Sequence, residues 1–71
     1  MRKKVRGYIL QFTSADHGGR HIHVYRDNHE LGVFDLEQGP IRGLDEVWST
    51  ELREVIEGFI KELNERGFFR T

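Results

Sequence analysis

The chain has 71 residues, a formal net charge of −1 and no cysteine. This length is enough for one domain with a small core, so we expect residues 1–71 to form a single domain. The absence of cysteine excludes a disulfide framework and a thiolate metal site. It is also compatible with a reducing cytoplasm, where we expect the protein to be located.

The small net charge hides an uneven distribution along the chain. Residues 1–27 hold six basic and two acidic residues, a net charge of +4, and residues 28–71 hold five basic and ten acidic residues, a net charge of −5. A nucleic-acid-binding domain is usually basic throughout, so composition does not by itself indicate one. The basic end would nevertheless suit phosphate, and the acidic end a basic partner.

Apolar segments are too short for a membrane protein. No apolar run approaches the roughly 20 residues that a bilayer-spanning helix needs. The basic start resembles the flank of a signal peptide, but Arg6, Gly7 and Gln11 interrupt the apolar stretch that follows. We therefore expect a soluble protein that does not interact with membranes.

A two-residue period predicts the first strand over residues 5–12. Tyr8, Leu10 and Phe12 share one face of this strand, and Val5 and Ile9 share the other. Residues 13–19 are polar and rich in glycine, and they predict a loop.

Strict alternation predicts a second strand over residues 21–25, and residues 29–36 predict a third. Asp27 and Asn28 tolerate positive φ and can form a tight turn between them. This turn sets a register in which His23 faces Gly32 and His21 faces Phe34. One face is then aliphatic, with Ile22, Val24, Leu31 and Val33. The other face is polar, with His21, His23, Tyr25 and Glu30.

The C-terminal half predicts one amphipathic helix. Ser49 or Thr50 is suited to cap its start, and Gly67 to end it. The apolar residues in between follow helical spacing: Leu52, Val55, Ile56, Phe59, Ile60 and Leu63. Phe68 and Phe69 follow the helix and would either close the core or present an apolar patch to a second subunit.

These elements predict an α+β fold. Three antiparallel strands, with a short fourth strand around Ile41, would pack against the single C-terminal helix. The aliphatic face of the sheet would lie under the helix. The histidines would point away from it, into solvent.

The most specific local feature is the pair His21 and His23. Residues two apart in a strand point the same way, so two imidazoles can act as acid and base on one substrate or bind one metal ion. Asp16 and His17 in the preceding loop would add ligands for zinc or nickel. The simpler interpretation is that the pair is structural, because neutral histidine is an acceptable half-buried strand residue.

Two arginines flank this strand and extend the predicted binding surface. Arg20 and Arg26 can bind phosphate groups, or they can serve as solvated charges that prevent strand-to-strand association. The full set of predicted binding residues is Arg20, His21, His23, Tyr25, Arg26 and Glu30. No Ser-His-Asp order or paired carboxylates stand out, which favours a role without catalysis.

The motif order resembles a small prokaryotic family, the domain of unknown function 4160. The resemblance is carried by residues 8–12, the His-x-His-Val strand at residues 21–24, residues 32–35 and the C-terminal amphipathic helix. The family has prolines just before the histidine pair, where this chain has Gly18, Gly19 and Arg20. The resemblance implies a compact single domain encoded beside another small gene, as in toxin–antitoxin pairs, and it implies no particular reaction.

Three functional hypotheses follow. The first is a non-catalytic binding or regulatory module that acts with a protein partner or a second copy of itself, with nucleic acid as a further candidate ligand. The second is a small ribonuclease-like toxin that uses His21 or His23, with Arg20 steadying a phosphate. The third is a weak metal-binding protein that uses His21, His23 and Asp16 or His17; in the first two, no cofactor is needed.

Overall fold

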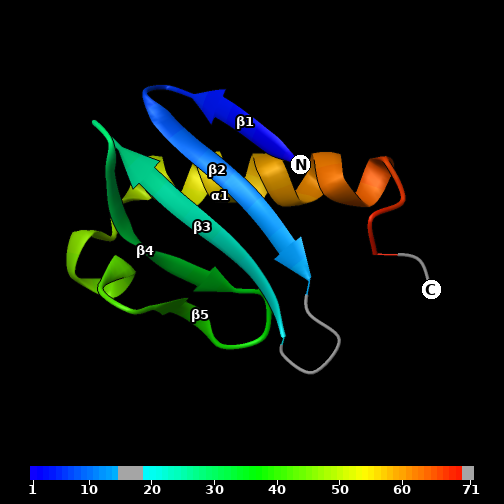
Figure 1. Cartoon of the computed structure of the whole chain (residues 1–71). Helices are drawn as coiled ribbons and strands as arrows, with labels where there is room; N and C mark the ends of the chain where they lie inside the picture. Colours follow the sequence, from blue (N-terminus) through cyan, green and yellow to red (C-terminus); the bar gives the residue numbers. More distant parts are fainter. Residues whose placement is uncertain (15–18, 70–71) are drawn as a thin grey trace.

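The computed structural model describes residues 1–14 and 19–69, which form a five-stranded antiparallel sheet and one long helix (Figure 1). The strands are β1 (Arg2–Val5), β2 (Tyr8–Ser14), β3 (Arg20–Arg26), β4 (His29–Asp35) and β5 (Gly39–Ile41). A short 3-10 helix, η1 (Leu44–Val47), precedes the helix α1 (Thr50–Glu65). Each strand pairs with its neighbour in sequence, so the sheet is a meander. The α+β prediction is confirmed, but the sheet has five strands and not three or four.

The predicted first strand is in fact two strands. β1 and β2 are joined by a turn at Arg6 and Gly7, whose φ angles of 51° and 85° match the tight turns that suit hairpins. Val5 pairs with Tyr8 and shares its face, so the prediction that Val5 lies on the opposite face is wrong. The residues of β1 are mostly basic and show no apolar alternation, which is why the sequence did not predict this strand.

The helix begins and ends as its sequence predicts. The Ser49 hydroxyl accepts a hydrogen bond from the Leu52 N–H at 3.1 Å, so Ser49 is the cap. After the helix, Gly67 adopts a φ of 81°, which glycine tolerates best. The Phe68 N–H donates to the Leu63 carbonyl and the Gly67 N–H to the Asn64 carbonyl, the paired bonds of a Schellman motif.

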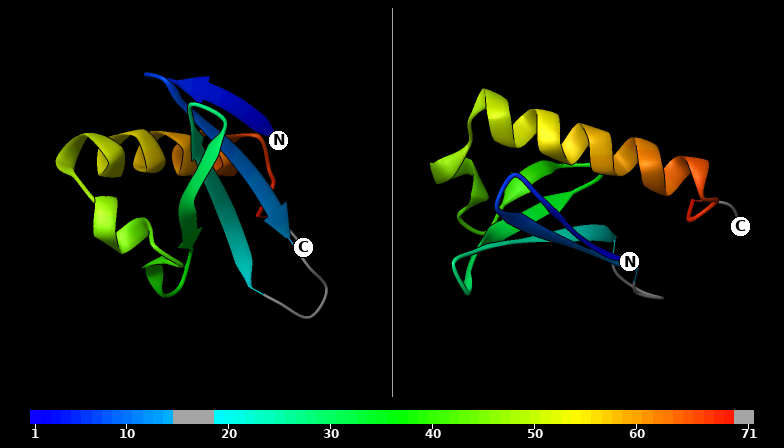
Figure 2. Two further views of the ribbon diagram at one scale, coloured as in Figure 1. Left: turned by 60° about the vertical axis from the view of Figure 1, so that its left-hand side comes forward. Right: turned by 90° about the horizontal axis from the view of Figure 1, so that it is seen from above.

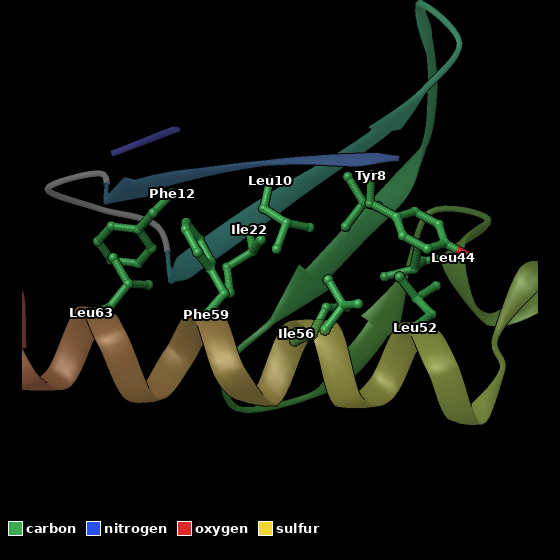
Figure 3. Packing of buried hydrophobic residues seen from close by; sticks show 11 residues of the cluster. Tyr8, Leu10, Phe12, Ile22, Leu44, Leu52, Ile56, Phe59 and Leu63 are labelled. Carbon is green, nitrogen blue, oxygen red and sulfur yellow. The ribbon is translucent and has the colours of Figure 1, made fainter. Parts of the chain in front are cut away.

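α1 packs against one face of the sheet and buries the core between the two layers (Figure 2). Leu10, Ile22 and Val24 from the sheet contribute to one cluster with Leu52, Ile56, Phe59 and Leu63 from the helix (Figure 3). At one end of the core, the Phe12 ring makes edge-to-face contacts with Phe68 and Phe69, at centroid distances of 6.0 and 5.7 Å. These two phenylalanines therefore close the end of the core, although Phe68 stays 43% exposed. Within residues 1–14 and 19–69, no helix combines the length and apolar character needed to cross a bilayer.

The β3–β4 hairpin starts in the predicted register and then shifts by one residue. Asp27 and Asn28 form the tight turn, with φ angles of 51° and 66°, and Tyr25 faces Glu30 as predicted. A β-bulge at Leu31 follows, after which Val24 faces Gly32. The predicted pairs beyond this point are wrong: His23 faces Val33 and His21 faces Asp35.

The bulge coincides with a close backbone contact. Gly32 lies on the helix side, and a Cβ atom there would be 2.3 Å from the Leu44 backbone nitrogen. Its φ of 154° also favours glycine. The predicted register implied that Gly32 leaves space beside His23, and this is wrong. The glycine instead lets η1 pack against β4. The same shift moves Val33 to the face away from the helix, next to His23 and Ile41, where it is fully buried.

Candidate functional site

The face of the sheet that lies away from α1 carries the histidines, and we call it the outer face. In Figure 1 it points toward the viewer, with the helix behind the sheet. Partners in an antiparallel register point to the same side, so the outer face consists of three rows that cross the strands. The rows are Thr13–His21–Asp35–Gly39, then Arg2–Gln11–His23–Val33–Ile41, then Lys4–Ile9–Tyr25–Glu30.

His21 is held by a carboxylate that the sequence did not single out. The His21 Nε2 and Asp35 Oδ2 atoms are 3.0 Å apart, and the Asp35 side chain is only 10% exposed. The other Asp35 oxygen, Oδ1, accepts hydrogen bonds from the Glu37 and Gln38 N–H groups at 2.8 and 3.0 Å. Asp35 is thus fixed by the chain that follows β4, and it fixes the His21 ring in turn.

These contacts also set the charge of Asp35. The backbone hydrogen bonds from Gln38 and Glu37 lower its pKa, desolvation opposes them, and the hydrogen bond and charge of His21 act in the same direction as the backbone. The net result is a pKa below the ordinary value for aspartate. Asp35 is therefore a carboxylate at neutral pH, able to orient the imidazole through Nε2 and leave Nδ1 for a ligand.

His23 is oriented by a second carboxylate in a more exposed setting. Its Nδ1 atom lies 3.1 Å from Glu30 Oε2, and the Glu30 side chain is 45% exposed. The ring also stacks on Tyr25, with centroids 6.5 Å apart and planes at 18°. His21 and His23 therefore lie on the same face as predicted, and each has one nitrogen engaged by a carboxylate.

Gly19 lies directly against the His21–Asp35 pair. A Cβ atom at this position would be 3.2 Å from Asp35 Oδ2 and 3.8 Å from His21 Nε2. The glycine that the sequence assigns to a plain loop therefore gives the backbone room to pass close to the pair. A larger residue there would crowd the carboxylate.

The two arginines of the predicted binding set lie on the other side of β3. The Arg20 guanidinium sits 5.3 Å from the centre of the Phe69 ring, and that of Arg26 sits 4.7 Å from the centre of the Tyr8 ring. Arg26 also donates a hydrogen bond to the Tyr8 hydroxyl at 3.1 Å. The structure thus brings His21, His23, Tyr25 and Glu30 together but not the arginines, and the binding role of all six stays a prediction.

The predicted metal site depends on residues outside the described part of the chain. Asp16 and His17 fall in the segment 15–18, about which the structure gives no description. Among the described residues, no group of three or more His, Cys, Asp or Glu side chains is arranged to hold a metal ion. Zinc or nickel binding by His21 and His23 therefore stays a prediction that needs Asp16 or His17.

Three charged residues on the outer face were missed from the sequence: Arg2, Lys4 and Asp35. Asp35 was missed because the bulge changes its partner; the isolated glycine Gly32 inside the predicted strand is the signal that could have indicated this bulge. Arg2 and Lys4 were missed because β1 itself was not predicted. Gly7 is the one signal that could have found them, since a turn there makes residues 2–5 a separate strand, with Arg2 and Lys4 on one face and Lys3 on the other.

Comparisons with known proteins do not assign this site. No family model, no curated protein and no solved structure matches the chain. The resemblance to the domain of unknown function 4160 therefore remains an expectation.

Proposed function

We propose that this protein is a small, non-catalytic binding and regulatory module whose recognition surface is the outer face. One observation carries the proposal: α1 covers a single face of the sheet, and the other face holds an ordered set of paired polar side chains around the buried Val33. A solvated sheet face is common, so openness alone would not be informative. The presence of Tyr25 and Arg2 on this face supports the proposal further, because Tyr and Arg are among the residue types that most often dominate binding energy.

Fixed geometry supports recognition on this face. Asp35 and Glu30 each hold a histidine, so these side chains lose little conformational freedom on binding. Such a surface can bind either of two kinds of partner. One is a protein encoded by a neighbouring gene, as the family resemblance implies, and the other is a nucleic acid. We expect the module to act in the cytoplasm.

The outer face can be tested by affinity capture from cells of the source organism. The bait is the tagged protein as wild type, as Tyr25→Leu, and as Lys61→Ala, which changes an exposed residue of α1. We expect Tyr25→Leu to lose most of the captured macromolecule, protein or nucleic acid, because it removes an aromatic side chain from the recognition surface. Lys61→Ala should capture as much as the wild type.

Thermal unfolding of the three baits by circular dichroism separates lost binding from lost folding. If Tyr25→Leu is folded and captures the same macromolecule in the same amount, the outer face is not the recognition surface.

A second candidate, a histidine-dependent ribonuclease-like toxin, is favoured by the two carboxylate-oriented imidazoles. General acid–base cleavage of RNA needs one group to take the 2′-hydroxyl proton and another to protonate the leaving oxygen. His21 and His23 are two positions apart on one face, at roughly 7 Å. Arg20, which was expected to steady the phosphate, lies on the opposite side of β3, so Arg2 and Lys4 would have to take that role.

Growth on expression distinguishes the toxin from the binding module. For a toxin, the wild-type protein should arrest growth and His23→Ala should restore it, while His29→Ala should still arrest growth because His29 lies at the hairpin turn. The same three proteins should be incubated with total RNA. Normal growth and intact RNA with the wild-type protein would exclude the second candidate.

A further inference from the structure

We propose that the outer face binds single-stranded nucleic acid, with phosphates at Arg2 and Lys4 and bases stacked on Tyr25 and His23. This inference rests on the proposed function, because it names the partner of the same recognition surface. The inference depends on β1. This strand adds Arg2 and Lys4 to a face for which the sequence alone predicts His21, His23, Tyr25 and Glu30.

Two basic residues of the outer face lie at its β1 edge. Arg2 lies in the row of Gln11 and His23, and Lys4 lies in the row of Ile9 and Tyr25. Both are exposed, and neither forms an ion pair with a described carboxylate. The two acidic residues in the rows of this face, Asp35 and Glu30, lie away from that edge on β4, each within hydrogen-bond distance of a histidine. The surface therefore offers two free cations at one edge, which suits an anionic partner.

Two flat rings lie on the same face as these cations, two strands away. His23 and Tyr25 project from the same side of β3 with their rings nearly parallel, at 18°. β1 is two strands away from β3, about 10 Å at the usual strand spacing, so one nucleotide chain lying across the sheet could contact both. Stacking on aromatic rings with backbone phosphates on Lys and Arg is the common way in which proteins hold single strands.

The shape of the surface favours a single strand over a duplex. Reading a duplex requires a helix or a β-ribbon that enters a groove, whereas the outer face is the broad side of a five-stranded sheet. Bases can reach the rings of a sheet only when they are unstacked, as in single strands. Gln11 lies between Arg2 and His23 in the same row and supplies an amide for the edge of a base.

Fluorescence anisotropy with labelled oligonucleotides tests this inference. The probes are single strands of about ten uridines and of about ten thymidines, and a duplex of the same length, at about 50 to 200 mM salt. We expect both single strands to bind more tightly than the duplex. Tyr25→Leu should weaken binding by about tenfold, and Tyr25→Phe should retain it.

The salt dependence identifies the phosphate contacts. Combining Arg2→Ala with Lys4→Ala should reduce the slope of log affinity against log salt by about 1.4, because each phosphate contact on a single strand contributes about 0.7. Lys61→Ala is the matched control, since it removes the same type of charge from α1 and should leave the slope unchanged. The uridine and thymidine probes show whether the preferred ligand is RNA or DNA.

Three results would overturn the inference. The first is no binding of any probe at micromolar protein and low salt. The second is an equal reduction of the salt slope in Lys61→Ala and in the double Arg2→Ala, Lys4→Ala variant. The third is tighter binding of the duplex. If the probes fail but Tyr25→Leu still loses a captured protein, the outer face is a protein-binding surface and the proposed function stands. If both the probes and the capture difference fail, the proposed function fails as well.

Discussion

Asp35 is the residue on which the polar end of the outer face depends. It joins three parts of the chain, because it pairs with His21 on β3 and accepts the N–H groups of Glu37 and Gln38 beyond β4. Gly19 leaves room for this contact. A carboxylate fixed in this way keeps its neighbouring imidazole in one orientation, which both a binding surface and an acid–base site require.

The lowered pKa of Asp35 predicts how stability depends on pH. Between the ordinary aspartate pKa of about 3.9 and the lower value in the folded state, the unfolded chain binds more protons than the folded chain. The free energy of unfolding should therefore fall as the pH falls through this window. Asp35→Asn should show a smaller loss over the same range, measured by urea unfolding from about pH 7 to about pH 2.5.

Glu62 also has a lowered pKa, so it adds to the loss of stability at low pH. A separate variant is needed to distinguish its effect from that of Asp35. The pKa of Glu62 is lowered mainly by the hydrogen bond from Lys3, so Lys3→Met should also reduce the acid-induced loss of stability. If Asp35→Asn loses as much stability as the wild type on acidification, the hydrogen bonds to Asp35 do not favour its ionised form in solution.

At the scale of the elements, the bulge in β4 determines which side chains form the site. Without it, Asp35 would lie on the helix side and His21 would face Phe34. With it, Phe34 faces Ile22 on the helix side and stacks on Trp48 at a centroid distance of 5.8 Å, while Asp35 reaches His21. The bulge therefore serves both the core and the outer face.

Two glycines give a matched test of this packing. Gly32→Ala should destabilise the protein by about 3 kcal/mol or more, since its Cβ would overlap the Leu44 backbone and its φ is unfavourable. Gly58→Ala should stabilise it by about 0.5 to 1 kcal/mol, because Gly58 lies within α1 and a Cβ there meets no atom within 4 Å. Urea unfolding measures both.

Similar stabilities of the two glycine variants would mean that η1 does not pack closely on β4. In that case the register shift, and with it the His21–Asp35 pair, would need another cause.

At the scale of the whole molecule, strand alternation divides the basic residues of β1 between the two faces of the sheet. Lys3 lies on the helix side of β1, where its ammonium group is 2.8 Å from the Glu62 carboxylate of α1. Such a pair at the surface contributes little to stability. Arg2 and Lys4 lie on the outer face instead. The basic strand β1 thus contacts the acidic helix through Lys3 and places Arg2 and Lys4 on the face that carries the histidines.

The sequence by itself determined the sides of β3, the turn between β3 and β4, and both ends of α1. The two-residue period of β3, the helical period of α1, the turn at Asp27 and Asn28, and the Ser49 and Gly67 signals all depend on residues close together in the chain, and the structure confirms them. Ile22 and Val24 lie in the core, and His21 and His23 lie outside it, as alternation predicts.

Only the tertiary structure decided which strands pair and in which register. β1 is a strand because β2 offers it a partner, and β4 shifts by one residue where Gly32 meets the Leu44 backbone. The physical reason is that side-chain periodicity is a local property, whereas the choice of hydrogen-bond partner depends on packing between segments far apart in the chain. The choice of partner strand and register is what places Asp35, Arg2 and Lys4 on the same face as the histidines.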